Sequence, residues 1–359
     1  MDFFPRRVWR IDRAGSLDRM RLVDDRLPAP GEQEARVRVE ATGLNFADIF
    51  ACLGLYSATP RGPFTPGLEF SGVVEEIGGR VPSLHPGVRV IGCIRFGGYA
   101  SHLNVDARYV YPLPEGWCPA QGAAFPVNAL TAWYALMELA AVRSGHLVLL
   151  HSAAGGVGLQ ALAIMRKLGV RAIATVGQPD KVEFLVRHAG LSRGQIIIRD
   201  ARRFSAQLEA ALSSAGAPGT DAVLDSVAGE FFQAGYRSLK PGGRLVLYGA
   251  ASLMPSGKRP NYFKLAWRYL QRPRPDPLEM TSANKSIMGF NLIWLWEQHM
   301  LFRTMLEQTM KLELPPPHIG ARFPFEDAPR ALRHLQSGSS VGKVILDHCD
   351  TGLDRRKAN

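Results

Sequence analysis

The sequence predicts an α/β protein in which a doubly wound parallel sheet is joined to a second, mainly antiparallel domain of barrel-like form. Two patterns support this. Up to residue 127, short strand-like segments are separated by Gly/Pro turns and helices are few. From Leu147 onward, strand-like and helical segments alternate at the spacing of right-handed βαβ units. A chain of 359 residues is long enough to give both parts their own core.

In the first part, alternating and β-branched segments predict strands, followed by a helix that leads into the second part. The predicted strands are residues 35–41, 72–76, 88–93 and 109–111, and the helix spans 129–141.

Residues 147–158 carry the strongest functional signal in the chain. The apolar run Leu147–Leu150 predicts a buried strand, and a helical pattern follows the small-residue loop and ends at Gly169. In that loop, Ala154 to Val157 would surround a pyrophosphate, because Gly155 and Gly156 allow it to approach the backbone at the positive end of a helix. Gly158 would let the helix pack closely on the strand. The alternative is a tight turn that binds nothing.

The remaining alternation predicts a sheet of six strands. The further strands are 170–176, 195–199, 222–225, 244–248 and 286–290, with helices at 181–188, 204–213 and 230–239 and a turn at 240–243. After Leu292 we expect one long helix, and then a strand at 341–346 that returns to the first domain.

Composition narrows the class of protein. Hydrophobic residues make up 46% of the chain, no apolar stretch is long enough to cross a membrane, and the charged N-terminus does not resemble a signal peptide. Four scattered cysteines argue against a disulfide framework and suit the reducing cytoplasm, where we expect the protein. The net charge of +11 would attract anions, but no nucleic-acid motif accompanies it.

Several motifs, in order along almost the whole chain, resemble the medium-chain dehydrogenase/reductase superfamily. Within it, the chain is similar to the zinc-free quinone oxidoreductases, and more narrowly to the vesicle amine transport protein branch. The motifs are at 43–48, 54–56, 65–72, 151–158, 221–226, 239–243, 248–253, 288–292 and 341–343. The resemblance implies a GroES-like domain formed by 1–127 and 292–359, a Rossmann domain at 128–291, a cleft between them, and a homodimer.

The same resemblance assigns residues to the cleft. Asn45 and Thr131 would lie near the nicotinamide and its ribose, and Tyr56 on the lip would donate a proton or a hydrogen bond to the substrate. The other residues assigned to the cofactor are Tyr248, Gly249, Phe290, Leu292 and Lys343.

We expect no catalytic metal in this cleft. In zinc-dependent relatives a cysteine and a histidine hold the metal, whereas the corresponding positions here carry Asn45 and Leu68. Glu69, left without a metal, is expected to form hydrogen bonds inside the barrel. Hydride transfer would then depend on cofactor positioning and hydrogen-bond donors.

The second strand of the parallel sheet favours NADPH over NADH. It ends at Gly177 without the acidic residue that would grip the ribose of NADH, and Lys181 and Arg199 are two cations that could meet a 2′-phosphate. A solvated basic face is the alternative explanation for both cations.

Three functions fit these features. The first is an NADPH-dependent, zinc-free reductase of a quinone or an α,β-unsaturated carbonyl compound. The second is a membrane- or lipid-associated protein with weak or no catalysis on the same scaffold, and the third is an enoyl reductase of a biosynthetic pathway.

Residues 258–274 bear on the choice between these functions. They combine aromatic residues with Lys and Arg, so as a helix they could contact an anionic membrane. The alternative is that their aromatic side chains are buried, across the substrate cleft or in a dimer contact.

Overall fold

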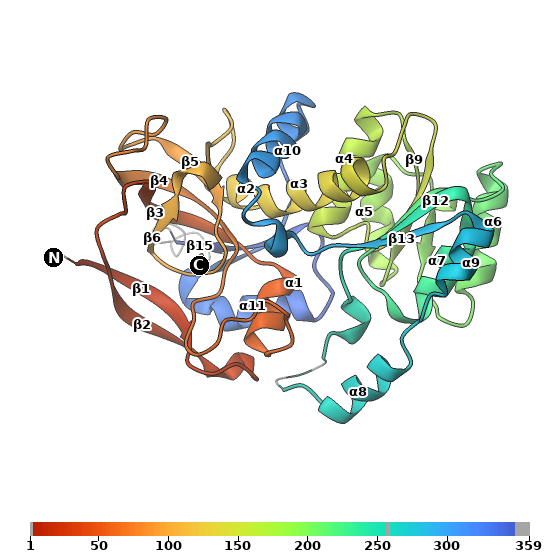
Figure 1. The fold of residues 1–359 in the computed structure, drawn as a ribbon, viewed down its shortest axis with the longest axis horizontal. Helices are drawn as coiled ribbons and strands as arrows, with labels where there is room; N and C mark the ends of the chain where they lie inside the picture. The colour runs from red at the N-terminus through yellow and green to blue at the C-terminus, as the bar shows by residue number, and fades with distance from the viewer. Residues whose placement is uncertain (1–2, 256, 258, 349–359) are drawn as a thin grey trace, which may run out of the picture.

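The computed structural model describes residues 3–255, 257 and 259–348, and contains two large sheets that lie beside each other (Figure 1). The ends of the two predicted GroES-like segments, residues 1–2 and 349–359, lie outside the described residues, as does residue 258 of the aromatic segment.

The first large sheet is parallel and has six strands in the order β10-β9-β8-β11-β12-β13. Two runs of strands therefore leave β8 in opposite directions, which confirms the predicted doubly wound sheet. The strands are β8 (Leu147–Leu150), β9 (Arg171–Val176), β10 (Ile196–Ile198), β11 (Thr220–Asp225), β12 (Leu239–Leu247) and β13 (Ser286–Gly289).

Helices connect these strands, and all but α9 lie at the predicted places. They are α4 (Gly156–Lys167), α5 (Asp180–Ala189), α6 (Phe204–Ser214), α7 (Phe232–Ser238) and α9 (Pro277–Ala283). The turn predicted at 240–243 is instead part of β12, where Gly242 has a φ of 83° and the pairing with β11 shifts register.

The second large sheet has the order β14-β15-β3-β4-β5-β7, with β6 also paired to β3. Its strands are β3 (Glu34–Gly43), β4 (Glu69–Ile77), β5 (Arg89–Cys93), β6 (His102–Asp106), β7 (Val110–Pro112), β14 (Ile319–Pro324) and β15 (Lys343–Asp347). Antiparallel pairing of β15 with β3 confirms that the C-terminal strand returns to the first part of the chain. A hairpin of β1 (Phe4–Ile11) and β2 (Met20–Leu27) precedes this sheet.

The short helices α1 (Phe46–Cys52), α2 (Pro119–Ala123) and α3 (Pro126–Trp133) lie along the junction of the two parts, and α3 continues as a π-helical turn, Tyr134–Leu139. One hydrophobic core runs from Ile91 and Phe125 to Val148 and Leu150, so the two sheets share buried contacts.

The prediction of one long helix after Leu292 is wrong. The structure has two helices, α10 (His299–Lys311) and α11 (Ala328–Gln336), separated by strand β14. Pro315, Pro316 and Pro317 prevent a continuous helix, since proline lacks the backbone N–H that helical bonding needs. Half-buried and exposed residues then alternate along β14, which is the pattern of a strand at a sheet edge.

Helix α8 (Tyr262–Leu270) lies at the lower edge of the molecule in Figure 1, apart from both sheets. Phe263 is 90% exposed, Trp267 63% and Leu270 61%, so the expectation that its aromatic side chains are buried across the cleft is wrong for this chain by itself. Arg268 connects the helix to the body, since its Nη1 donates to the carbonyl of Ser252 at 2.6 Å.

The close packing of α4 on the loop that follows β8 depends on Gly158. A Cβ there would lie 2.5 Å from the carbonyl oxygen of Ser152 and 2.6 Å from Cα of Ala153. We predict that Gly158→Ala lowers the free energy of unfolding by about 1–3 kcal/mol, the usual range for overpacking. Chemical denaturation checks this. Gly194→Ala is the matched control, because a Cβ at Gly194 meets no atom within 4 Å. An equal effect of both substitutions would contradict the steric account.

Candidate cofactor and substrate cleft

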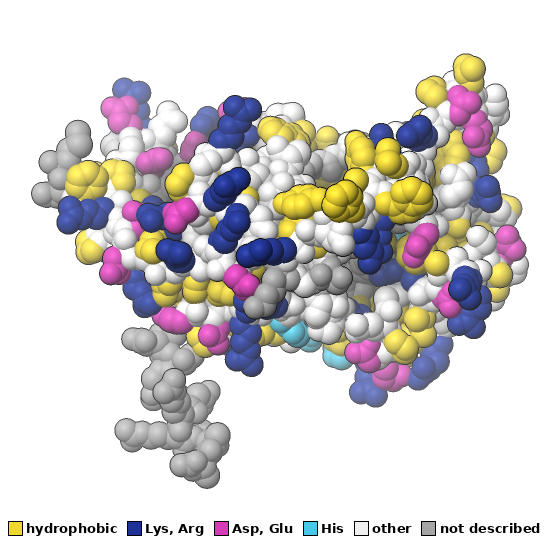
Figure 2. Space-filling model, turned by 90° about the horizontal axis from the view of Figure 1, so that it is seen from below, with side chains coloured by type: hydrophobic (Ala, Val, Ile, Leu, Met, Phe, Trp, Pro, Cys, Tyr) yellow, Lys and Arg dark blue, Asp and Glu magenta, His cyan; other side chains and the backbone are white. Residues whose placement is uncertain are grey.

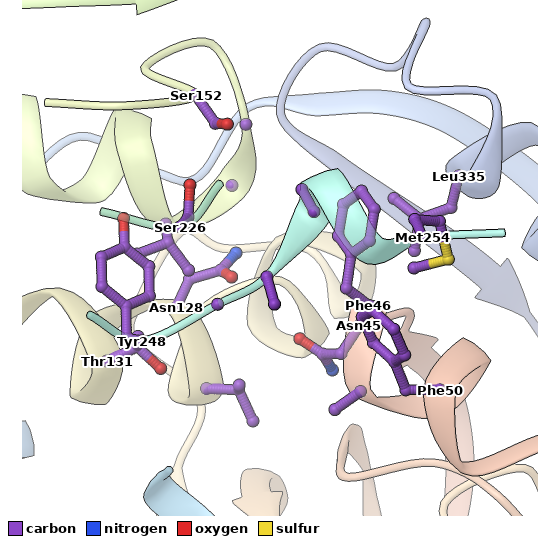
Figure 3. Close-up of a pocket in the computed structure, with 18 of the residues that line it drawn as sticks. Asn45, Phe46, Phe50, Asn128, Thr131, Ser152, Ser226, Tyr248, Met254 and Leu335 are labelled. Atoms are coloured by element: carbon purple, nitrogen blue, oxygen red, sulfur yellow. The ribbon is translucent and has the colours of Figure 1, made fainter. Parts of the chain in front are cut away.

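A cavity of about 920 Å³ lies between the two sheets, and residues from both line it (Figure 3). Every residue that the sequence assigned to catalysis or to the cofactor is among its lining residues. These are Asn45, Tyr56, Thr131, Ala154, Gly155, Gly156, Val157, Gly177, Lys181, Arg199, Tyr248, Gly249, Phe290, Leu292 and Lys343. The fold therefore brings them to one place, while their individual roles remain predictions.

One end of the cavity is formed by the glycine-rich loop between β8 and α4. Gly155 precedes the first turn of α4 in an extended conformation, and Gly156 is the first helical residue. A Cβ on Gly156 would lie 2.4 Å from Nδ2 of Asn128, so no larger residue fits without displacing that amide. The first turn of a helix has unpaired N–H groups and a positive dipole, which suit a phosphate.

The C-terminal segment is bonded to this loop. The N–H of Gly342 donates to the carbonyl of Ala154 at 2.8 Å, directly before β15 begins. The glycine-rich loop of the parallel sheet and the last strand of the other sheet are therefore fixed to each other.

Gly177, Lys181 and Arg199 form a basic corner of the cavity. A guanidinium nitrogen of Arg199 lies 3.1 Å from the position that a Cβ on Gly177 would take, so the arginine packs against the end of β9. Burial lowers the pKa of Arg199 to about 10, which leaves it charged at neutral pH. Its Nη1 donates to Thr175 Oγ1 at 2.8 Å.

Lys181 is buried and already holds two acceptors. Its Nζ donates to the carbonyls of Gly338 and Ser340 at 2.5 and 2.8 Å, and burial lowers its pKa. The expectation of a solvated basic face is therefore wrong for Lys181, which also ties α5 to the segment before β15.

The centre of the cleft contains a buried ion pair. Nζ of Lys343 lies 2.5 Å from Oε1 of Glu69, and it donates to Oδ1 of Asn45 at 2.7 Å and to Oδ1 of Asn128 at 3.4 Å. The ammonium group thus has an acceptor for each of its three protons. Only 4% of the Lys343 side chain and none of the Glu69 side chain is exposed.

Glu69 is hydrogen-bonded inside the barrel, as expected. Its Oε2 accepts from the N–H of Val127 at 2.8 Å and its Oε1 from Nδ2 of Asn45 at 3.0 Å. Asn45 stands at the N-cap position of α1, but its side-chain oxygen accepts from Lys343 rather than from the helix.

These contacts are unsuited to zinc. An ammonium group lies against the one carboxylate of the cluster, and a metal would have to displace it. Within the described ranges, no group of three or more His, Cys, Asp or Glu side chains is arranged to hold a metal ion.

Tyr56 closes the cleft from the barrel side. Its hydroxyl donates to Oδ1 of Asn291, which follows β13, at 2.7 Å. Burial raises the pKa of Tyr56 to about 12, so the hydroxyl keeps its proton across the physiological range. A phenol has one proton, so Tyr56 can donate to a substrate oxygen that gains negative charge once its hydroxyl turns away from Asn291.

Several lining residues were missed by the sequence reasoning. Figure 3 shows Asn128, Ser226, Met254 and Leu335 around the cavity together with Phe46 and Phe50 of α1. Asn128 precedes Thr131 by three positions, so helical periodicity could have placed both on one face of α3. Met254 and Leu335 belong to no motif that we recognised.

Comparison with known proteins agrees with this architecture. Residues 31–115 match the family model described as an alcohol dehydrogenase GroES-like domain, and residues 194–346 match one described as a zinc-binding dehydrogenase. The chain is 30% identical over 342 residues to the mouse synaptic vesicle membrane protein VAT-1 homolog-like, covering 93% of this chain and 79% of that protein. This chain belongs to the medium-chain dehydrogenase/reductase superfamily.

Solved structures of this oxidoreductase superfamily superpose over almost the whole chain. The human VAT-1 homolog-like protein has a TM-score of 0.79 and 27% identity, covering 96% of this chain and 98% of that one. The quinone oxidoreductase of Thermus thermophilus, solved also with NADPH, has a TM-score of 0.75 and 32% identity, covering 95% and 99%. The CurK enoyl reductase has a TM-score of 0.79 and 26% identity, with the same coverage of 95% and 99%.

Asp48 lies near the ion pair, and its burial leads us to expect that the stability of the protein depends on pH. Its side chain is fully buried, and its Oδ2 accepts from the N–H of Asn45 at 2.8 Å and from the hydroxyl of Tyr99 at 3.1 Å. Burial raises the pKa of Asp48 to about 7, whereas an unfolded aspartate titrates near 3.9. Between these values the folded protein retains a proton that the unfolded chain releases, so stability falls as pH rises.

We predict that Asp48→Asn removes this loss. The free energy of unfolding of the variant minus that of the wild type should increase by about 2–4 kcal/mol from pH 4 to pH 8, because only the wild type loses stability over this range. Denaturant titrations at a series of pH values measure this difference. Replacement of the exposed Glu209 of α6 by Gln is the control. A pH-independent difference for Asp48→Asn would contradict the buried, protonated carboxyl.

Proposed function

We propose that this chain is an NADPH-dependent, metal-independent reductase that delivers hydride to a quinone or to an α,β-unsaturated carbonyl compound. The observation that carries the proposal is one continuous cavity that connects a phosphate-type glycine loop and a basic corner to the Tyr56 hydroxyl. The NADPH complex of the Thermus thermophilus quinone oxidoreductase supports the choice of cofactor.

The residues at the glycine loop fit a dinucleotide. Gly156 and Gly158 both stand where a Cβ would collide with neighbouring atoms, so the loop can present its backbone N–H groups without side chains. The absence of a carboxylate at the end of β9, beside Lys181 and Arg199, suits a 2′-phosphate. When bound, the nicotinamide supplies the hydride.

Residues of the chain then position the reacting groups and stabilise the developing charge. Asn45 and Thr131 line the inner part of the cleft, where the buried ion pair prevents Asn45 from rotating. The Tyr56 hydroxyl stabilises the oxygen of the conjugated carbonyl as it gains charge. Conjugated carbonyl compounds suit such a site, because they accept hydride without a Lewis acid and need only a hydrogen-bond donor.

The first test is the oxidation of NADPH, followed by its absorbance, over a panel of quinones, enones and enoyl thioesters. Turnover of quinones or enones supports the proposal. Preferential turnover of enoyl thioesters would instead support a biosynthetic enoyl reductase, the activity named for the CurK neighbour. No oxidation with any acceptor would overturn both.

Cofactor preference depends on the basic corner. We predict that Lys181→Ala weakens NADPH binding by about 1–3 kcal/mol more than NADH binding. The comparison matters because Lys181 also holds Gly338 and Ser340, and loss of those bonds should change both affinities equally. Fluorescence titration of both cofactors gives the difference, and Lys311→Ala, at the exposed end of α10, is the control. Equal weakening of both cofactors would refute a 2′-phosphate contact.

Catalysis should depend on the Tyr56 hydroxyl. Tyr56→Phe is expected to lower kcat by about 10²-fold, the scale for one oxyanion donor, while NADPH affinity and thermal stability stay close to the wild type. Asn291→Ala serves as the control, since it removes the observed partner of Tyr56 but keeps the hydroxyl. If both variants lose activity equally, Tyr56 acts only by bridging the two domains.

The α8 surface favours a second candidate function, contact with an anionic membrane. None of the described helices has the length and apolar character needed to cross a bilayer. Yet α8 exposes a run of large apolar side chains, and Figure 2 shows hydrophobic groups beside Lys and Arg on the face where α8 lies. The exposed apolar residues of α8 are Tyr262, Phe263, Trp267, Tyr269 and Leu270.

Cations on and beside α8 complete an interfacial pattern. Lys264, Arg272 and Arg274 are exposed, and the guanidinium of Arg272 lies 3.9 Å from the ring centroid of Tyr269. Aromatic side chains at the headgroup level and cations at the lipid phosphates are the usual means of peripheral binding. The mouse relative is named a synaptic vesicle membrane protein homolog, which agrees with this candidate.

We predict that the protein co-sediments with vesicles containing phosphatidylserine but not with phosphatidylcholine alone, and that salt weakens the binding. Arg272→Ser with Arg274→Ser should reduce binding, as should Phe263→Ser with Trp267→Ser, and both pairs should spare NADPH oxidation. Arg268 is left intact because it anchors α8 to Ser252. Failure of the wild type to sediment at low salt would remove this candidate.

A further inference from the structure

A second cavity, of about 750 Å³, lies along α4. Its walls come from α4, from α5 and from the segment Leu314–Ile319 that leads into β14. Asn128 and Gly156 line both cavities and form part of the wall between them. Neither the sequence reasoning nor the proposed reaction uses this space.

The charged residues that line the second cavity are basic. Arg166 and Lys167 at the end of α4 line it, and no Asp or Glu is among the described lining residues. His188 and His318 line it as well, and burial lowers the pKa of His318, so that ring carries no charge at neutral pH. The guanidinium of Arg166 reaches the end of α5, since its Nη1 lies 4.0 Å from the position of a Cβ on Gly190. Such a lining attracts an anion.

A buried donor in the same wall lacks an acceptor. Gln160 of α4 is only 4% exposed, and its Nε2 has no hydrogen-bond partner among the described residues. An unsatisfied buried donor costs about 1–3 kcal/mol. This atom has almost no accessible surface, so a bound acceptor would remove the cost only once the amide turns toward the cavity.

The rest of the lining is apolar and aromatic. Phe184 stacks on His188 with ring centroids 4.2 Å apart and lies 4.7 Å from the ring of His318. His188 is held in place, because its Nδ1 lies 3.1 Å from the carbonyl oxygen of Phe184. Leu159, Leu162 and Leu314 add aliphatic surface. A flat apolar body therefore has rings and leucines to pack against.

The segment that closes the cavity is fixed by the other sheet. The carbonyl of His318 accepts from the N–H of Lys343 at 3.0 Å, so this wall is tied to the strand that carries the central ion pair. The cavity therefore has fixed walls on both sides.

We propose that this second cavity binds a small aromatic carboxylate, with the ring against Phe184, His188 and His318 and the carboxylate beside Arg166 and Gln160. The site is separate from the cofactor cleft, and binding there does not require the reductase activity.

Ligand-observed NMR with benzoate as the probe tests the proposal, using the full-length protein saturated with NADPH. Benzoate should bind, and benzamide, which keeps the ring but lacks the charge, should bind at least about tenfold more weakly, the loss expected when a charge-assisted contact is removed. Arg166→Gln and Gln160→Leu should each weaken benzoate binding several-fold. Since Gln160 is buried and its variant could misfold, the exposed Arg166 supplies the independent test.

A control variant and a cofactor comparison locate the bound probe. Arg187→Gln removes an α5 cation that pairs with Glu183 and does not line the second cavity, so it should not change benzoate binding. Benzoate should also bind equally well with and without NADPH, because the two cavities are separate. Displacement of benzoate by NADPH would place it in the main cleft and overturn the proposal. The proposal would also be overturned by any of three results. These are equal binding of benzamide and benzoate, no binding of benzoate, and no effect of Arg166→Gln and Gln160→Leu.

Discussion

The buried ion pair between Glu69 and Lys343 is the contact on which the cleft depends. Neither side chain reaches solvent to any useful extent, and two charges taken out of water are costly unless hydrogen bonds complete their shells. Here they do, because Asn45, Asn128 and the N–H of Val127 supply the remaining partners. Loss of either charge would leave the other buried and unpaired, a change that costs about 3–5 kcal/mol in other proteins.

The same cluster sets the geometry between the two sheets. Glu69 begins β4 and Lys343 begins β15, while Asn128 belongs to α3 at the junction. Gly342 extends the connection to the glycine-rich loop through its bond to Ala154. The buried ion pair and the glycine-rich loop of the cleft are therefore held by neighbouring residues of one short segment.

Local sequence signals predicted most of the parallel sheet, because each of its strands is a short apolar run and each connection begins with small or polar residues. The loop at 154–157 and the cations at 181 and 199 were found in the same way, from their positions at strand ends. The cluster was harder to predict, since Asn45 and Lys343 are 298 positions apart and only the folded chain shows that they share a bond. Strand β14 was missed because the preceding prolines had not been used to end the helix. For α8 the apolar residues share one face when the segment is written as a helix, but amphipathic periodicity does not show whether a partner covers that face.

The place of β15 in the sheet has a consequence for how the chain acquires its structure. This strand pairs with β3, so the barrel sheet contains a contact between residues that are synthesised far apart in time. At about 5–20 residues per second, the edge of β3 and the carboxyl group of Glu69 wait tens of seconds for their partners. A contact of such high sequence separation also slows folding in free solution, because the entropy of closing the loop is lost before the contact forms. The parallel sheet, whose strands follow one another closely, can form while the ribosome is still at work, and the barrel then closes around its last strand.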